Sequence, residues 1–192
     1  QFMPIVKSIF KCICFRCSKL LLNKNHPIVK TILKETAGDY EKRFNKIKKL
    51  VKNVKVCGKG KEDDINYVEC GCGAIQPTRY FSSGLDFLNV EYTEMKNKQK
   101  TKITQSIMAD VALEILKRIS KEDALTLGFH EDWCLPHWLI CTVLPVVPPS
   151  VRPSVKMYNN QRSEDDITHK YNDILKHNNA LKDRLENTDT PE

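Results

Sequence analysis

The spacing of the cysteines constrains the fold of this chain more than any other feature of its sequence. Cys14 and Cys17 form a Cys-x-x-Cys pair, the spacing at which one tight turn presents two thiolates to a single zinc ion. Cys12 lies too close to Cys14 to form such a pair with it. A structural zinc site takes four ligands, usually from two turns, so we expect a second turn further along the chain.

Three later cysteines are candidates for that second turn. Cys57, Cys70 and Cys72 are each followed directly by glycine, which lets backbone amides turn toward the sulfur. These residues alone predict Cys57 as the third ligand and leave Cys70 and Cys72 as rivals for the fourth place. The other reading of the pattern is reduced, buried cysteines without metal.

The redox state of the cell compartment determines whether paired cysteines bind a metal ion or form a disulfide. The longest apolar run, residues 139–147, is about half of what a bilayer requires. Basic residues interrupt the N-terminal apolar segment, and no cleavage site follows. We therefore expect no membrane association and a reducing compartment, where paired cysteines indicate metal. The chain begins with Gln rather than Met, and we expect it to be a piece of a longer protein.

A second group of metal-ligand residue types comprises His130, Cys134, His137 and Cys141. On one helix these four residues would share a face, but Pro136 interrupts the segment. The run that follows is typical of a strand entering a buried sheet, which would not bring the side chains together. We expect no second metal here and predict that Cys134 and Cys141 are small core residues.

The basic charge is concentrated near the N-terminus. Residues 1–61 carry 16 Lys and Arg against 3 Asp and Glu, whereas residues 62–192 carry 15 against 21. Such a segment is typical either of a surface for nucleic acid or of a solvated helix face. The hydrophobic content of 41% is sufficient for a packed core.

Apolar spacing and cap residues predict the main elements. Ser120 with Asp123, and Ser163 with Asp166, have the spacing of helix caps. We expect helices over residues 23–38, 39–54, 108–120 and 163–187, a strand over 87–95 and a lysine-rich turn over 96–102. No set of residues in the chain predicts a catalytic site.

The last predicted helix follows a proline-rich segment, residues 144–153, and carries a heptad seam. A seam of this kind must be covered by another helix. Because it is short, an antiparallel partner outside this sequence is favoured over a coiled-coil dimer. The seam consists of Ile167, Tyr171, Ile174, Asn178, Leu181 and Leu185.

Five stretches in order resemble the N-terminal region of the largest subunit of eukaryotic-type multisubunit DNA-directed RNA polymerases. They are "FKCICFRCSKLLL", "CGAIQP", "ILKRISKEDALTLGF", "LPVVPPSVRPSV" and "QRSEDDITHKYNDILK". The resemblance implies an α+β fold: a predominantly helical, zinc-bearing clamp head over residues 1–135, then the start of the clamp core and the first arm of a helical hairpin over 136–192. It assigns structural Zn²⁺ to Cys14, Cys17, Cys57 and Cys72, because the family usually has glycine in place of Cys70.

The resemblance also implies a function. The complete enzyme synthesises RNA on a DNA template, and this segment is the mobile clamp that closes over DNA and the RNA–DNA hybrid. The magnesium-binding catalytic motif "NADFDGD" is absent from the sequence, so Mg²⁺ belongs to the rest of the subunit. The bias toward lysine suits a large DNA virus as well as an AT-rich cellular genome. The expected location is the nucleus for a cellular protein, and a cytoplasmic viral factory or the virion for a viral one.

Candidate contacts follow from the same resemblance. Phosphate contacts are expected at Lys46, Lys49, Lys52 and Arg152, although flanking prolines could equally direct Arg152 toward an internal carboxylate. Initiation and elongation factors and other subunits are the expected protein partners. Lys176, Lys182 and Arg184 are candidate contacts for them, or simply a solvated face. The alternative function is a stand-alone zinc-binding interaction module.

Overall fold

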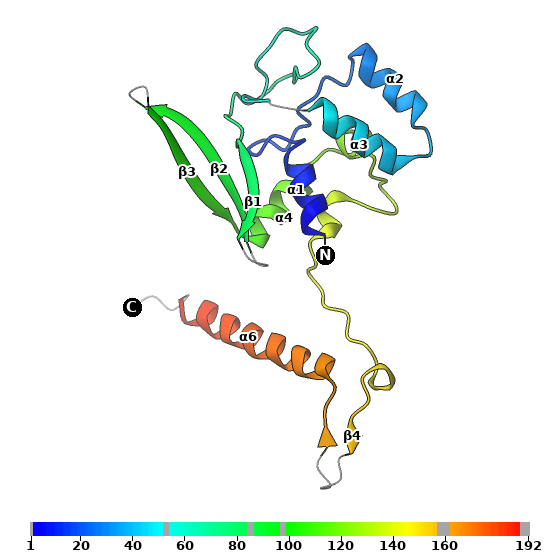
Figure 1. Ribbon diagram of the computed structural model, residues 1–192, viewed down its shortest axis with the longest axis vertical. Helices are drawn as coiled ribbons and strands as arrows, with labels where there is room; N and C mark the ends of the chain where they lie inside the picture. Colours follow the sequence, from blue (N-terminus) through cyan, green and yellow to red (C-terminus); the bar gives the residue numbers. More distant parts are fainter. Residues whose placement is uncertain (1, 52–53, 84–86, 97–98, 157–161, 189–192) are drawn as a thin grey trace. The chain divides into compact units, whose positions relative to one another are not determined.

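The computed structural model describes residues 2–51, 54–83, 87–96, 99–156 and 162–188. The chain divides into two compact units, Gln1–Cys141 and Thr142–Glu192 (Figure 1). We describe each unit by itself. Among the described residues, no helix combines the length and the apolar composition needed to cross a membrane.

The helices predicted over 23–38, 39–54 and 108–120 are confirmed with shorter bounds as α2, α3 and α4, whereas α1 was not predicted. His26 caps α2 through an Nδ1 atom that accepts from Ile28 N, and Asp39 caps α3 by accepting from Lys42 N. Ser120 caps α5 by accepting from Asp123 N at 3.1 Å, as predicted. The helices are α1 (Met3–Phe10), α2 (Pro27–Glu35), α3 (Tyr40–Leu50), α4 (Ala109–Lys117) and α5 (Lys121–Leu127).

An antiparallel sheet of three strands completes the first unit. Its order is β1-β2-β3, with β1 (Arg79–Ser83), β2 (Phe87–Lys96) and β3 (Gln99–Ile107). The strand predicted over 87–95 is confirmed. The turn predicted over 96–102 is wrong at residue 96, which ends β2, and over 99–102, which pair with β2 in β3. Backbone pairing with a neighbouring strand overrides the polar composition of this segment. Residues 97–98 lie outside the described residues.

The core of this unit surrounds α1, which lies between the sheet and the other helices (Figure 1). Ile9, Phe10, Ile47, Leu116 and Leu127 are fully buried. Along residues 39–54, the apolar spacing 4, 3, 4 predicts one buried stripe. Ile47 and Val51 are buried and Phe44 is partly buried, but Tyr40 is 41% exposed. Gly128 ends α5 in the left-handed conformation, at φ +96°, against the carbonyl of Tyr40. A side chain there would collide with α3, so this glycine sets the distance between the two helices.

The segment after residue 130 differs from the prediction. Residues 136–139 form a short 3₁₀ helix, and residues 140–148 belong to no strand. The expected buried strand is therefore wrong, because Val143 is 79% and Val146 62% exposed. Cys134 and Cys141 are exposed, so their assignment to the core is wrong as well.

The second unit is a proline-rich segment with a single 3₁₀ turn, Pro149–Val151, followed by a long helix, α6 (Asp166–Thr188). A short ladder of β4 (Val155–Lys156) and β5 (Arg162–Ser163) precedes the helix. Ser163 lies in β5, and Asp165 replaces it as the cap, with Oδ1 accepting from Ile167 N at 2.8 Å. The predicted helix is thus confirmed, with its cap two residues later than expected.

Candidate metal centre

Four cysteine sulfurs converge on one point in the first unit. Cys14, Cys17, Cys57 and Cys72 have Sγ atoms that all lie within 4.8 Å of one another. The sulfurs of Cys14 and Cys72 are 3.5 Å apart, and those of Cys17 and Cys57 are 3.8 Å apart. The sequence and the resemblance predicted this set of four.

These distances suit a tetrahedral ion. Four Zn–S bonds of about 2.3 Å at tetrahedral angles separate the sulfurs by about 3.8 Å. The set contains only thiols, which favour zinc over hard cations that require oxygen ligands. All four positions are filled by protein, which is typical of a structural rather than a catalytic zinc site. The residues therefore fit Zn²⁺, which when bound would supply charge and a fixed geometry to four thiolates.

The first pair lies in a tight turn that closes on itself. Ile13 pairs with Leu20 as an isolated bridge, and Cys14 N donates to Lys19 O at 2.8 Å. Ser18 N donates to Cys14 O at 2.9 Å, and Ser18 adopts φ +60°. This left-handed residue reverses the chain directly after Cys17. The turn thus presents both sulfurs on one side.

The second pair lies in two loop segments whose backbones meet at glycine. Cys57 N donates to Ala74 O, and Gly73 N donates to Cys57 O, both at 3.0 Å. The backbones of Gly58 and Gly71 are in direct contact, since a Cβ on Gly58 would lie 2.6 Å from Gly71 Cα. Two glycines are therefore required because the backbones approach too closely for side chains. Their role is this close approach, in addition to the amide orientation inferred from the sequence.

A buried glutamine supports the centre, and sequence reasoning missed it. Gln76 is 4% exposed, and its Nε2 donates to Cys14 Sγ at 3.2 Å and to Ala74 O at 2.9 Å. Its Oε1 accepts from Phe15 N at 3.0 Å. Donors directed at a thiolate sulfur stabilise its charge and its orientation. The sequence signal, a glutamine four residues after a ligand cysteine, does not show by itself which way that side chain points.

The surroundings set the proton affinity of the thiols. Burial raises the pKa of Cys14 and of Cys57 above the usual value. At Cys72 burial also acts to raise the pKa, but the Ala74 amide and the neighbouring cysteines outweigh it and lower the pKa to about 7. A metal ion must therefore displace protons from Cys14 and Cys57, which makes its binding dependent on pH.

The two rival cysteines lie outside this group. Cys70 is exposed and adopts φ +52°, a conformation typical of glycine. Cys12 is fully buried, and burial raises its pKa to about 12 despite the nearby Lys48 and Lys11. Within the described ranges no other group of three or more metal-ligand residues converges. His130, Cys134, His137 and Cys141 are not brought together as such a group.

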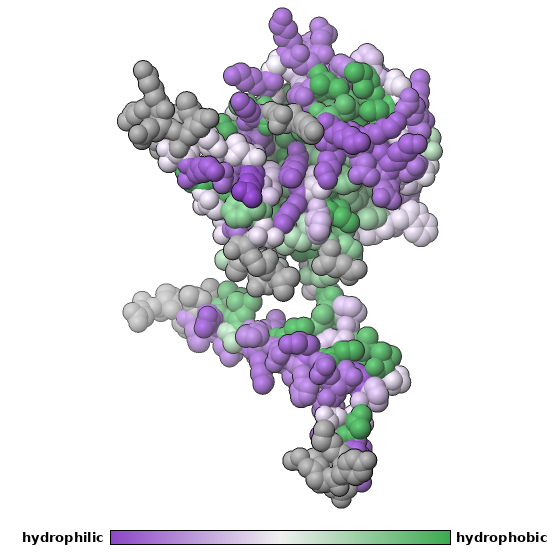
Figure 2. Space-filling view, in the orientation of Figure 1, coloured by the Kyte–Doolittle hydropathy of each residue, from purple (hydrophilic) through white to green (hydrophobic). Residues whose placement is uncertain are grey.

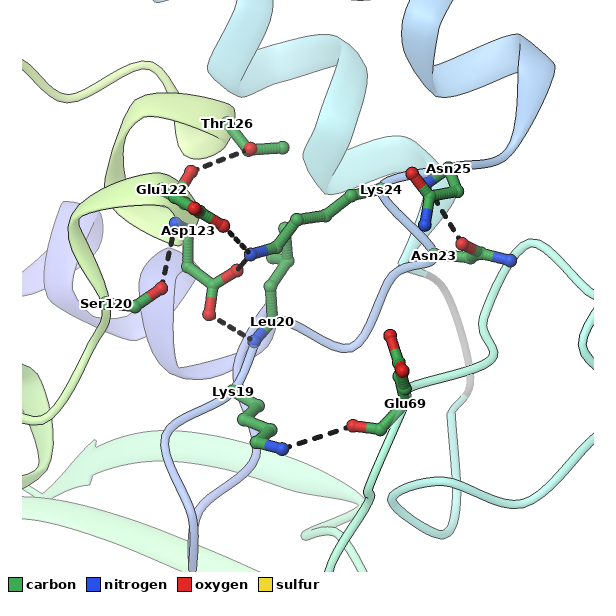
Figure 3. A network of polar contacts seen from close by, with 10 residues as sticks. All are labelled: Lys19, Leu20, Asn23, Lys24, Asn25, Glu69, Ser120, Glu122, Asp123 and Thr126. Atoms are coloured by element: carbon green, nitrogen blue, oxygen red, sulfur yellow. Dashed lines mark hydrogen bonds and ion pairs between the residues drawn. The ribbon is translucent and has the colours of Figure 1, made fainter.

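A polar network joins the first cysteine turn to α5 (Figure 3). Asp123 accepts from Leu20 N at 3.4 Å, and its carboxylate lies 2.7 Å from Lys24 Nζ. Lys19, on the same segment, donates to the carbonyls of Glu69 and Cys70 at 3.1 Å. The segment after the first cysteine turn is thus connected both to α5 and to the loop that precedes Cys72.

The predicted phosphate contacts have different surroundings. Lys46 forms an ion pair with Glu35 at 2.6 Å, whereas Lys49 is exposed in α3. Lys52 lies outside the described residues. Arg152 interacts within its own unit: Nε donates to Val147 O, Nη1 to Thr168 Oγ1, and the guanidinium lies 5.6 Å from the Tyr171 ring centroid. Its direction is internal, toward a carbonyl and a hydroxyl rather than a carboxylate.

The predicted partner contacts all lie on α6. Lys176, Lys182 and Arg184 are exposed, and Lys182 pairs with Glu186 at 3.7 Å. The apolar side chains of the heptad seam are also exposed, at 39% for Ile167 and 56% for Leu181. The helix thus presents basic and apolar groups to its surroundings together.

Comparison with known proteins identifies relatives of this chain. A model of the family described as "RNA polymerase Rpb1, domain 1" matches residues 1–192. The chain is 40% identical over 185 residues to "DNA-directed RNA polymerase II subunit RPB1" from Euplotoides octocarinatus. The match covers 96% of this chain and 38% of that protein, so the chain spans well under half the length of this relative.

Proposed function

The chain belongs to the Rpb1 domain 1 family of RNA polymerase largest subunits, and on this premise we propose that it forms the mobile clamp of a DNA-directed RNA polymerase. The complete enzyme polymerises ribonucleotides on a DNA template. The clamp's contribution is mechanical, because it closes over DNA and the RNA–DNA hybrid. The observation that carries the proposal is the family match over the whole chain.

The zinc centre gives the clamp head its rigidity. Cys14, Cys17, Cys57 and Cys72 hold Zn²⁺ and join segments that are far apart in the sequence. Clamp head and clamp core correspond to residues 1–135 and 136–192 in this proposal, close to the observed division of the chain after Cys141. Mg²⁺ chemistry belongs to the catalytic motif, which does not occur in residues 1–192.

Nucleic acid is retained through phosphate contacts without sequence readout. Lys46, Lys49 and Lys52 lie in the basic segment, and we assign them this role. Arg152 contributes indirectly, by positioning the proline-rich segment against Thr168 and Tyr171. Such retention weakens steeply with salt, because each phosphate contact releases a counterion.

Helix α6 is the first arm of an antiparallel hairpin, and its exposed apolar seam supports this assignment. Initiation and elongation factors dock on this arm, through Lys176, Lys182 and Arg184, and other polymerase subunits bind elsewhere on the clamp. In a cell the protein is nuclear. In a large DNA virus the location is a cytoplasmic factory or the virion. Membership of the polymerase family does not favour the alternative of a stand-alone zinc module.

The test uses the full-length protein that contains this chain, tagged and purified with its associated subunits. The complex should incorporate ribonucleotides in a reaction that depends on DNA template and Mg²⁺. A photo-crosslinking amino acid at Lys49 should label DNA in transcribing complexes, whereas the same group at Lys30, exposed on α2, should not. Absence of synthesis refutes the polymerase assignment. Synthesis with equal crosslinking from both positions refutes the clamp contact alone.

A further inference from the structure

A pocket of about 580 Å³ opens on the first unit beside the metal centre. It lies between the end of α1, the C-terminal half of α3 and the loop segment, residues 76–78, that leads into β1. Its floor is apolar, with Leu21, Val51 and Pro77 buried. Its rim is basic, and consists of Lys11, Lys48, Lys49 and Lys55. Hydrophilic side chains cover much of the viewer-facing surface of the first unit in Figure 2.

Among the described residues, no carboxylate pairs with the lysines of the rim. All four lysines are exposed. Lys48 donates to a neutral partner, Ser8 Oγ, at 2.9 Å. Four cations around one opening repel one another, so a complementary anion is the favoured occupant of this surface.

The floor requires an apolar group rather than a polar one. Among the polar side chains that line the pocket, the buried Gln76 already donates to Cys14 Sγ and Ala74 O and accepts from Phe15 N. It therefore has no need of a partner from a ligand. Burying a leucine or phenylalanine side chain on such a floor favours binding, because it removes apolar surface from water. The pocket thus combines an apolar anchor site with a ring of cations.

We propose that this pocket binds an acidic peptide segment of a partner protein, with one large apolar side chain on the floor and carboxylates against Lys11, Lys48 and Lys55, which leaves Lys49 to the phosphate contact proposed above. This pairing of an anchor with a charged rim is a common mode of peptide recognition. Nucleic acid fits the same rim less well. Its phosphates would reach the lysines, but the aliphatic floor offers no flat aromatic platform for a base. The partly buried Tyr80 packs its ring 6.2 Å from that of Phe10 instead.

The experiment measures fluorescence anisotropy with the zinc-loaded chain and a labelled twelve-residue probe of Asp and Glu around a central Phe. Two variants test the pocket. Lys48→Glu with Lys55→Glu reverses charge on the rim, and Asn45→Trp fills the opening without altering charge. Two matched controls lie on α2: Lys30→Glu with Lys34→Glu, and Thr31→Trp. All these control positions are exposed, and Lys34, like Lys48, lies in the last turn of its helix.

The rim pair should weaken probe binding at least tenfold, and Asn45→Trp at least fivefold, while each control changes it less than threefold. A probe with Ala in place of Phe should bind at least fivefold more weakly. If the rim pair and the control pair lost the same affinity for the probe, the effect would be due to net charge alone, and the proposal would be overturned. Equal binding of the Ala probe, or no saturation below about 1 mM, would also overturn it. A single-stranded DNA that binds more tightly and loses affinity in the same variants would assign the pocket to nucleic acid.

Discussion

Lys24 Nζ lies 2.7 Å from Asp123 Oδ1, and this carboxylate side chain is only 6% exposed. The same carboxylate accepts from Leu20 N at 3.4 Å, so Asp123 joins α5 to the segment that leaves the first cysteine turn. Partial burial acts to lower the pKa of Lys24, but Asp123 and Glu122 outweigh it and raise the pKa. The pair thus connects distant parts of the sequence inside the first unit.

Removing the cation from this pair should destabilise the first unit. Lys24→Met leaves the buried carboxylate without its counter-charge. Breaking a fully buried pair costs about 3–5 kcal/mol, and because Lys24 is 38% exposed we expect about 1–3 kcal/mol by urea denaturation. Adding Asp123→Asn should recover part of the loss, because it removes the unpaired charge.

The comparison pair is Lys46 with Glu35, which are 2.6 Å apart but 34% and 54% exposed. Glu35→Gln should have a much smaller effect than Lys24→Met, because solvent screens an exposed pair. Equal effects of Lys24→Met and Glu35→Gln would contradict the role assigned to burial.

Zinc should bind at one equivalent per chain, through the four converging sulfurs. Cys72→Ser should lose the metal and much of the stability of the head, because the ion closes loops of about 40 and about 15 residues. Cobalt substitution should give the absorption of a tetrahedral thiolate site. The measurement is elemental analysis together with thermal unfolding.

Cys70→Gly is the matched control for that experiment. It also removes a thiol near the centre, but it should retain one zinc and near-normal stability, because φ +52° suits glycine. Two equivalents of zinc in the unmodified chain, or full retention in Cys72→Ser, would refute the ligand assignment.

Gln76 should affect how tightly zinc binds, while the number of zinc ions per chain stays at one. Gln76→Leu removes the donor to Cys14 Sγ and the acceptor of Phe15 N, and we expect affinity to fall about 10–100-fold. Gln76→Glu keeps the acceptor but adds negative charge beside the thiolates, so it should weaken binding further. Competition with a chromophoric chelator measures both. Gln105→Leu, exposed on β3, serves as control, and an unchanged affinity in both Gln76 variants would argue against this hydrogen bond.

Two glycines near the centre should respond differently to alanine. Gly71→Ala places a methyl group against Gly58 Cα, so the two loop segments that carry these glycines must move apart. Gly73 has open space around it but adopts φ +68°, so Gly73→Ala should cost only about 1–2 kcal/mol of conformational strain. We expect a greater loss of zinc affinity and stability from Gly71→Ala, measured on the zinc-loaded chain. The reverse order would rule out close backbone approach as the main role of Gly71.

Local patterns predicted the local features of this protein. The Cys14–Cys17 pair and the Ser120 cap were foreseen because each depends on spacing within a single turn. The choice of Cys72 over Cys70 came from the family resemblance and not from local spacing. Gln76 and the Lys24–Asp123 pair were not foreseen, because neither side chain carries a local sign of the distant residue it contacts.

The wrong predictions have a similar cause. Polar residues 99–102 form a strand because β2 supplies the backbone partners. The apolar run 139–147 has no neighbouring strand among the described residues, and Pro145 within it lacks the amide that a ladder requires. Hydrophobicity alone therefore did not distinguish a buried strand from an exposed, extended segment.

Helix α6 should be stable at its start and fray toward its end. Its first turns are attached to the proline-rich segment, since Tyr171 OH donates to Pro145 O and accepts from Val147 N, both at 3.1 Å. Beyond Tyr171 every described side chain of the helix is exposed, including Ile174 and Leu181. Long helices without tertiary packing are marginal in water. Amides 175–187 should therefore exchange with solvent much faster than those of α1 and α3.

Tyr171→Phe provides the internal comparison for this hydrogen-exchange experiment. It removes both hydrogen bonds but keeps the ring under Arg152, so fast exchange should extend into residues 167–174 while α1 and α3 stay protected. Strong, uniform protection along α6 would mean that the seam is covered within this chain or in a dimer. Protection that rises with protein concentration would identify the dimer. Either result would remove the argument for an antiparallel partner helix, because an apolar stripe that is already buried needs no second arm.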